Sequence, residues 1–186
     1  MSEIDKIIDL ATNWWVDVIQ DPKFDNGDTS QTGAISMIMS KMLVKDTNQE
    51  QLNKFKQIIQ NKIYENLSYD SDYILSVDYG PCRDLYEAAQ ESDISENNFP
   101  CKTTMWIGKD HLIVSYGYRS PLETLYANES YYENKIASCL KAIRDHKHKP
   151  DDYYTFGSRE EIIKEYEDEI EKYKKALEEL KKNGSC

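Results

Sequence analysis

The spacing of hydrophobic residues changes twice along the chain, and this change limits the fold more than any other feature of the sequence. Apolar residues recur at helical intervals as far as about residue 67, alternate with polar residues between 73 and 118, and return to helical intervals from about 129. Alternating runs joined by a short turn are typical of antiparallel strands. We therefore predict an α+β fold with N-terminal helices, a small central antiparallel sheet of about three strands, and C-terminal helices ending in a long amphipathic, heptad-like helix.

Three helices are expected before the sheet. Ser2 and Asp5 form a capping box at the start of the first helix, and Thr47 and Glu50 form another at the start of the third. The second helix contains the stretch GAISMIMSKMLV, residues 33–44, which is apolar nearly all round. A helix of this kind is expected to be buried on more than one side.

The central region is expected to contain a strand over 73–79 and a hairpin over 101–118, whose turn is the Gly-Lys-Asp sequence at 108–110. Pro81 suits the first turn of a helix that runs to about Glu91. The sequence Ser-Pro-Leu-Glu at 120–123 has the pattern of a capping box, so a short helix is expected after it.

The predicted organisation is an α+β domain over residues 1–150, a linker over 151–157 and a C-terminal helix over 158–186. Apolar residues of the last helix step by three and four, as in a heptad seam. The seam docks either on its own domain or on a partner, and a homo-oligomer through this helix is one form of the second alternative. The seam residues are Ile163, Tyr166, Ile170, Tyr173, Leu177 and Leu180.

Charge and composition exclude several classes of protein. The formal net charge is −11, which argues against sequence-independent binding of nucleic acid, because such binding uses Lys and Arg to release counterions from phosphates. The same charge favours either plain solubility or competition for a basic groove on a partner. No apolar run reaches the length of a membrane span, and the first ten residues lack the basic region of a signal peptide. We expect a cytoplasmic protein that does not bind membranes.

Cys82 is the candidate for catalytic chemistry. A thiol at the amino end of a helix gains thiolate character, and Arg83 would add to it. His111 is the candidate base, and Asp78 is the candidate for orienting that base. Together with Cys82 they would form the catalytic set of a thiol enzyme. The alternative is an inert, buried cysteine. Asp78 and Arg83 are also candidate binding residues, since both lie at a turn from strand to helix.

Asp21, Asp25 and Asp28 are the candidate ligands for Mg²⁺ or Ca²⁺. Their spacing does not fit an EF-hand, and Asp is common in turns and helix caps for local reasons. The four cysteines contain no C-x-x-C pair, so a zinc ribbon is not expected. We expect no cofactor.

An aromatic group on the predicted hairpin is a candidate binding surface. It consists of Trp106, Tyr116 and Tyr118, with Arg119 directly after. Tyr and Trp are frequent anchors at protein interfaces and also stack on bases. The alternative is that helices cover both faces of the sheet and that these side chains belong to the core.

Four segments carry a resemblance to known proteins: FDNGD, LSVDYGPCRDLYEAA, FPCKTTMWI and VSYGYRSPLETLY. In their residues and in their order along the chain, these segments resemble a group of small uncharacterised proteins from phages and prophages of Gram-positive bacteria, over about Trp14 to Tyr126. The resemblance implies an accessory factor, and many such factors block host defences such as CRISPR or nucleotide signalling. It transfers no functional residue to this chain.

These observations favour a non-enzymatic, phage-type protein that binds and inhibits a host defence protein through an acidic and aromatic surface, in the cytoplasm of the bacterial host. The expected partner has a basic surface, and the acidic residues of the last helix are part of the predicted contact: Glu165, Asp168 and Glu169. One alternative is a protein that sequesters a small nucleotide signal, with Arg83, Lys102 or Arg119 pairing with phosphate. The other alternative is the thiol enzyme.

Overall fold

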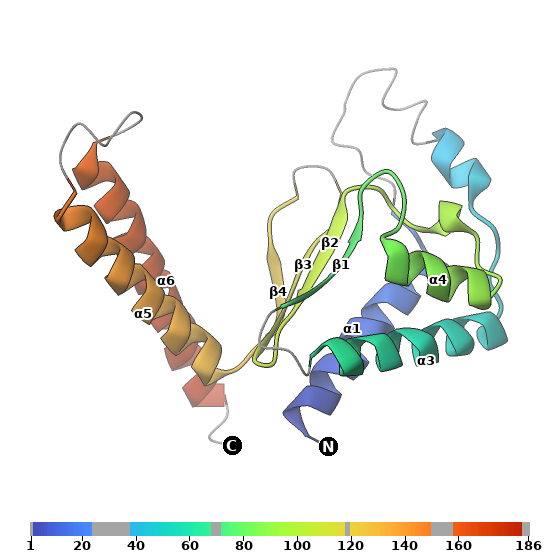
Figure 1. Ribbon diagram of the computed structural model, residues 1–186, viewed down its shortest axis with the longest axis horizontal. Helices are drawn as coiled ribbons and strands as arrows, with labels where there is room; N and C mark the ends of the chain where they lie inside the picture. The colour runs from blue at the N-terminus through green and yellow to red at the C-terminus, as the bar shows by residue number, and fades with distance from the viewer. Residues whose placement is uncertain (1, 24–37, 68–71, 118–119, 150–157, 184–186) are drawn as a thin grey trace. The chain divides into compact units, whose positions relative to one another are not determined.

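The computed structural model describes residues 2–23, 38–67, 72–117, 120–149 and 158–183 (Figure 1). The chain forms two compact units, Met1–Tyr126 and Ala127–Cys186. The predicted α+β class is confirmed: helices come first, an antiparallel sheet lies in the middle of the sequence, and two packed helices come last. The elements up to the unit boundary are α1 (Glu3–Gln20), α3 (Gln49–Asn66), β1 (Tyr73–Val77), α4 (Arg83–Glu91), the 3-10 helix η1 (Glu96–Asn98), β2 (Thr103–Ile107), β3 (His111–Ser115) and β4 (Glu123–Ala127).

The sheet has four strands in the order β1-β2-β3-β4, rather than about three. Its fourth strand, β4, occupies the place where the sequence predicted a short helix, so that prediction was wrong. The Ser-Pro-Leu-Glu pattern satisfies only the first turn of a helix, and the residues behind it include Thr124 and Tyr126, which favour strands. An open edge on β3 offers these residues a hydrogen-bonded partner.

Register divides the sheet into a core face and an outer face. Met105 of β2 is paired with Leu75 of β1 and Val114 of β3, and all three are buried. Trp106, the next residue of β2, points to the opposite face, where it is only partly buried.

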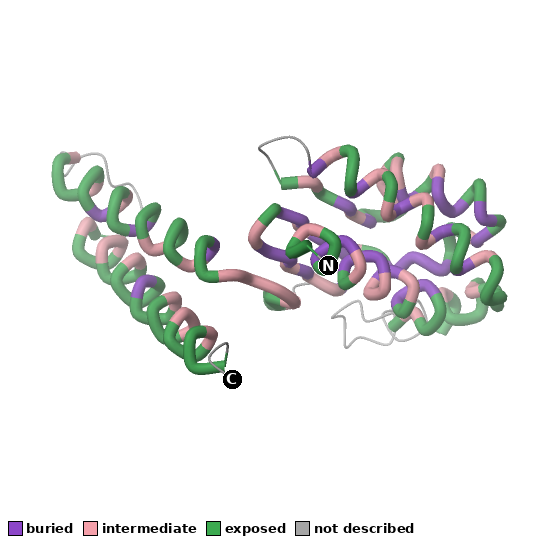
Figure 2. The backbone as a smooth tube through the Cα atoms, turned by 90° about the horizontal axis from the view of Figure 1, so that it is seen from below, coloured by how far each residue is buried: buried purple, intermediate pink, exposed green. Residues whose placement is uncertain are grey.

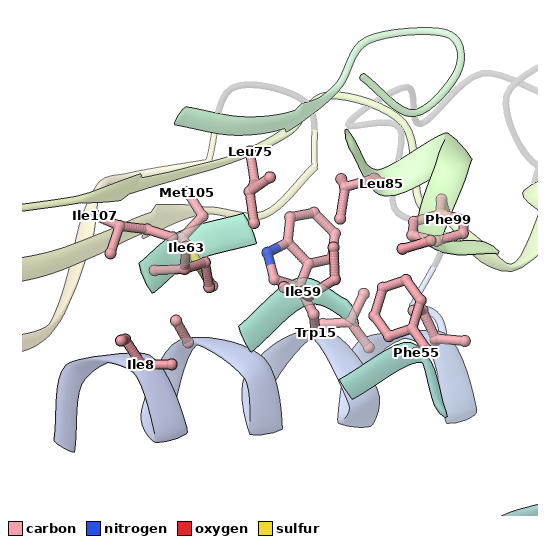
Figure 3. Close-up of a cluster of buried hydrophobic side chains, with 14 of the residues drawn as sticks. Ile8, Trp15, Phe55, Ile59, Ile63, Leu75, Leu85, Phe99, Met105 and Ile107 are labelled. Carbon is pink, nitrogen blue, oxygen red and sulfur yellow. The ribbon is translucent and has the colours of Figure 1, made fainter. Parts of the chain in front are cut away.

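Helices α1, α3 and α4 supply the other side of the core. Trp15 of α1 is fully buried beside Phe99, with ring centroids 6.2 Å apart, and Phe99 also contacts Phe55 of α3 at 6.0 Å. Figure 3 shows Trp15 at the centre of this cluster, below Leu75 and beside Leu85. Burying side chains of this size contributes about 1.5–3 kcal/mol each.

Helix starts agree with the predictions in one case and differ in two. The Ser2–Asp5 capping box is present. The third predicted helix, α3, is capped by Asn48 with Gln51, one residue later than expected, because Asn is a better N-cap than Thr. Helix α4 begins at Arg83, since Pro81 is used in a β-bridge to Val77.

A short helical segment at residues 38–43 is the described part of the predicted apolar helix. Four of its side chains are 55–79% exposed, so the expected burial is wrong for these residues: Ile38, Met39, Met42 and Leu43. Residues 28–37 of that helix lie outside the described part of the chain.

The second unit is a hairpin of two helices, α5 (Glu129–Lys147) and α6 (Arg159–Asn183). Its buried side chains are Tyr131, Cys139, Ile143 and Ile170, and half of the predicted seam packs around the last three. The seam of α6 therefore docks on a helix of its own chain. Figure 2 shows the difference in burial: the hairpin is mostly exposed, whereas the helices of the first unit are buried along one side.

The β2–β3 hairpin closes tightly over His111. Gly108 donates its backbone N–H to the carbonyl of His111 at 2.9 Å, and the imidazole is 8% exposed. A Cβ placed on Gly108 would lie 2.3 Å from Cε1 of His111, which leaves no room for a side chain.

Asn98 joins three parts of the first unit. Its side-chain nitrogen donates to the carbonyls of Lys45 at 2.7 Å and Ile19 at 3.2 Å, and its side-chain oxygen accepts from the Lys45 N–H at 3.1 Å. Asn98 is 1% exposed, so no solvent replaces these bonds. The end of α1 and the segment before α3 are thereby fixed to η1.

Replacing Asn98 with alanine should lower the free energy of unfolding of the first unit by about 1–3 kcal/mol, because buried backbone groups lose their partners. The exposed neighbour Asn97 is the matched control, and Asn97→Ala should change stability by less than about 0.5 kcal/mol. Urea denaturation followed by tryptophan fluorescence measures both, since the three tryptophans are residues 14, 15 and 106. Equal effects of the two substitutions would contradict the joining role of Asn98.

Candidate functional site

A cleft of about 500 Å³ lies at the carboxyl end of α1. The last two turns of that helix form one wall, and residues from the end of β3 and from β4 complete it. Clefts of this volume are typical of sites for small groups. The lining residues are Trp14, Asp17, Val18, Gln20, Asp21, Lys23, Tyr116 and Glu123.

Two aromatic rings form the apolar part of the cleft. The Trp14 and Tyr116 rings are nearly perpendicular, at 81°, with centroids 5.8 Å apart. The Tyr116 hydroxyl accepts the backbone N–H of Lys23 at 2.5 Å, which fixes the chain after α1 against β3. Burial raises the pKa of Tyr116, a neighbouring Asp21 adds to the rise, and the Lys23 N–H opposes it. The phenol is therefore neutral at physiological pH.

The polar part of the cleft is acidic. Asp17 and Asp21 lie one turn apart at the end of α1, and Glu123 comes from β4. Among the described residues, none of the three carboxylates forms an ion pair. Among the described residues of the lining, Lys23 is the one cation.

The helix itself adds to this negative potential. The carboxyl end of a helix carries a partial negative charge, which basic residues commonly offset. The last turn of α1 contains no basic residue. Asp17 and Asp21 lie there instead, and their negative charges are unfavourable at this end of a helix. A cation bound in the cleft would relieve this unfavourable arrangement.

The structure does not bring the predicted thiol-enzyme residues together. The N–H of Cys82 bonds the carbonyl of Ser76 at 2.7 Å, at the end of β1. His111 is the first residue of β3, and its ring nitrogens contact Asp110 at 2.7 Å and, just before the start of β1, Asp72 at 3.4 Å. Ser76 follows Asp72 by four positions of extended chain, which is about 13 Å. The arrangement therefore leaves Cys82 without His111 as a base.

The cations predicted near the turn from β1 to α4 form ion pairs with carboxylates. Lys102 forms an ion pair with Asp78, and its ammonium lies 4.2 Å from the centre of the Tyr79 ring. The Nε atom of Arg83 lies 2.7 Å from Glu87. A phosphate would have to displace these partners.

The predicted aromatic group is divided between the two faces of the sheet. Trp106 is paired with Ile74 and Ile113 on the outer face. Tyr116 packs on the core side, where it meets Trp14. The two remaining members lie outside the described residues: Tyr118 and Arg119.

The acidic residues predicted to bind on α6 are exposed. Glu169 accepts a weak hydrogen bond from the Cys139 thiol at 3.5 Å, and burial, followed by this carboxylate, raises the pKa of Cys139. Glu165 and Asp168 are equally exposed. Of the candidate metal ligands, Asp21 lines the cleft, whereas Asp25 and Asp28 fall in the part of the chain that is not described. The described residues contain no group of three side chains placed to hold a metal ion.

The sequence did not identify Trp14, Asp17, Lys23 and Glu123 as site residues. One signal was available, because two adjacent tryptophans on a helix cannot both point into the same core. A second signal was the pair of carboxylates at the unfavourable end of the helix.

No protein-family model matches the chain, and no curated protein matches it in sequence. Within the described residues, every helix is too short or too polar to cross a membrane.

A polar network near the amino end of α4 has a structural role. The Lys62 ammonium of α3 lies 2.9 Å from Asp84 and 2.8 Å from Glu87, and the Tyr73 hydroxyl donates to Asp84 at 2.6 Å. Lys62, followed by Arg83, lowers the pKa of Glu87 to about 2. Burial opposes ionisation of Asp84, but the bonds from Tyr73 and Lys62 outweigh it and hold that pKa below its ordinary value.

These shifts predict a stability that depends on pH. Both carboxyl groups have a lower pKa in the folded state than in the unfolded state, so their contribution is complete above about pH 5 and is lost as the pH falls toward 2. Lys62→Met should flatten this loss, as measured by urea denaturation at pH 7, 4 and 2.5. Lys174→Met, which removes an exposed pair with Glu171, is the control and should leave the curve unchanged. Parallel curves for the wild type and Lys62→Met would contradict the role of the network.

Proposed function

We propose that this chain is a non-enzymatic binding protein that holds a basic segment of a partner protein in the cleft at the end of α1. The observation that carries the proposal is the composition of the cleft: two aromatic rings and three carboxylates at the carboxyl end of a helix whose last turn has no basic residue. Each of these parts attracts a cation.

The charge of the whole chain supports the same partner. The sequence has 34 acidic and 23 basic residues. An excess of negative charge steers a basic partner toward the protein and raises the rate of association. An anionic ligand would meet this field and the three carboxylates of the cleft, and among the lining residues that the structure describes Lys23 is the one cation to attract it.

The proposed partner is a protein of the bacterial host, and anti-phage defence proteins of the CRISPR type are the first class to test. This part of the proposal rests on the resemblance to phage and prophage proteins. It has a physical rationale, because an acidic protein can occupy a basic groove that otherwise binds nucleic acid. Inhibition would then follow from competition for the groove.

The two alternative functions have less support from the geometry. Sequestration of a nucleotide needs cations available for phosphate, but Arg83 and Lys102 are paired with carboxylates, and the third predicted cation, Arg119, lies outside the described residues. A thiol enzyme needs a base beside Cys82, and His111 lies at the other end of β1.

The proposal predicts opposite effects of neutralising the anionic and the cationic residues of the cleft. The double variant Asp17→Asn, Asp21→Asn should weaken binding of a fluorescein-labelled decapeptide of alternating glycine and arginine about tenfold, which corresponds to about 1.4 kcal/mol. Lys23→Gln should strengthen it about two- to fivefold, the effect of one partly exposed charge. Fluorescence anisotropy measures both effects at an ionic strength of about 0.15 M, which screens charges beyond about 8 Å and so isolates local contributions.

The matched control is Glu165→Gln with Asp168→Asn, which removes the same charge from the exposed face of α6. This variant should bind the peptide as the wild type does. Equal weakening by both double variants would show that the peptide responds to net charge alone. Weaker binding of the peptide by Lys23→Gln would show that the charge of the cleft does not govern this binding, and either result would overturn the proposal.

A further inference from the structure

We propose that the group held in the cleft is the guanidinium of an arginine side chain, in preference to the ammonium of a lysine. The inference rests on the proposed function, because it names the chemical group that the same cleft binds. It is drawn from three features of the cleft: the orientation of its rings, the directions from which its carboxylates come, and its apolar floor.

The rings favour a planar cation. Trp14 and Tyr116 both line the cleft and lie at 81° to each other, so a flat group stacked on one ring stands nearly perpendicular to the other. A guanidinium stacks on an aromatic face and keeps its N–H groups in the plane, pointing outward. Trp is the strongest aromatic partner for such a cation. An ammonium has no flat face to place on the ring.

The arrangement of the carboxylates favours a cation that can donate hydrogen bonds in several directions. Asp17 and Asp21 are one helical turn apart, which places their Cβ atoms about 5–6 Å from each other. Glu123 approaches from β4, a different element. The five N–H donors of a guanidinium fan out in one plane and can reach carboxylates on more than one side. The ammonium of a lysine is a compact and strongly hydrated charge, so it loses more hydration than a guanidinium when it enters the cleft.

The floor of the cleft suits the stem of the side chain. Val18 lines the cleft and is 8% exposed, between the carboxylates of Asp17 and Asp21 in sequence. The methylene groups of arginine can cover such an apolar surface while the charged end stays among polar groups. The apolar stem of arginine thus matches Val18, and its planar charged end matches the rings and carboxylates of the lining.

The test compares two labelled decapeptides that differ only in having arginine or lysine at alternate positions, with glycine between. Anisotropy titration of the full-length protein should show the arginine peptide binding at least about fivefold more tightly, since only this cation both stacks and donates in several directions. Trp14→Leu should bring the ratio of the two dissociation constants close to one. Trp14→Phe keeps a ring, preserves the packing of the helix end, and should give an intermediate ratio.

Trp106→Phe is the matched control, because Trp106 lies on the outer face of the sheet and outside the cleft lining. It should keep the wild-type ratio. Equal binding of both peptides, weakened equally by Asp17→Asn with Asp21→Asn, would overturn the preference for arginine and leave the proposed function standing. No binding of either peptide, or binding that ignores Asp17 and Asp21, would overturn both.

Discussion

The burial of Trp15 is the interaction on which the rest of the first unit depends. This side chain is fully buried between α1, α3 and the sheet, and it contacts Phe99, which extends the core toward η1. Successive residues of a helix point about 100° apart. Once Trp15 enters the core, Trp14 must therefore turn aside, and it does so toward Tyr116. The aromatic wall of the cleft is a consequence of how the core is packed.

The sequence was sufficient for the elements that follow local rules. Strict alternation predicted β2, and the Ser2–Asp5 pair predicted the start of α1. Local rules failed for β4, because a four-residue capping pattern says nothing about the vacant edge of β3 that the next five residues can pair with. Propensity is a weak constraint wherever tertiary pairing offers an alternative.

The candidate site could not be predicted, for a different reason. Its residues come from α1, the end of β3 and β4, and no sequence spacing relates these elements. The predicted pairing of Cys82 with His111 failed because register places them at opposite ends of β1, and register is a property of the sheet. The cations show the same limit: Lys102 and Arg83 were predicted to be available for phosphate, but in the fold Lys102 is paired with Asp78 and Arg83 with Glu87.

The hairpin between β2 and β3 has an evolutionary consequence. The His111 ring occupies the space that a side chain at position 108 would need, so the two positions form one steric unit. A side chain at position 108 meets the His111 ring, which would have to shift, whereas a smaller residue at position 111 meets no such clash while Gly108 is kept. Divergence of this hairpin therefore favours one order of change, in which the histidine is replaced before the glycine.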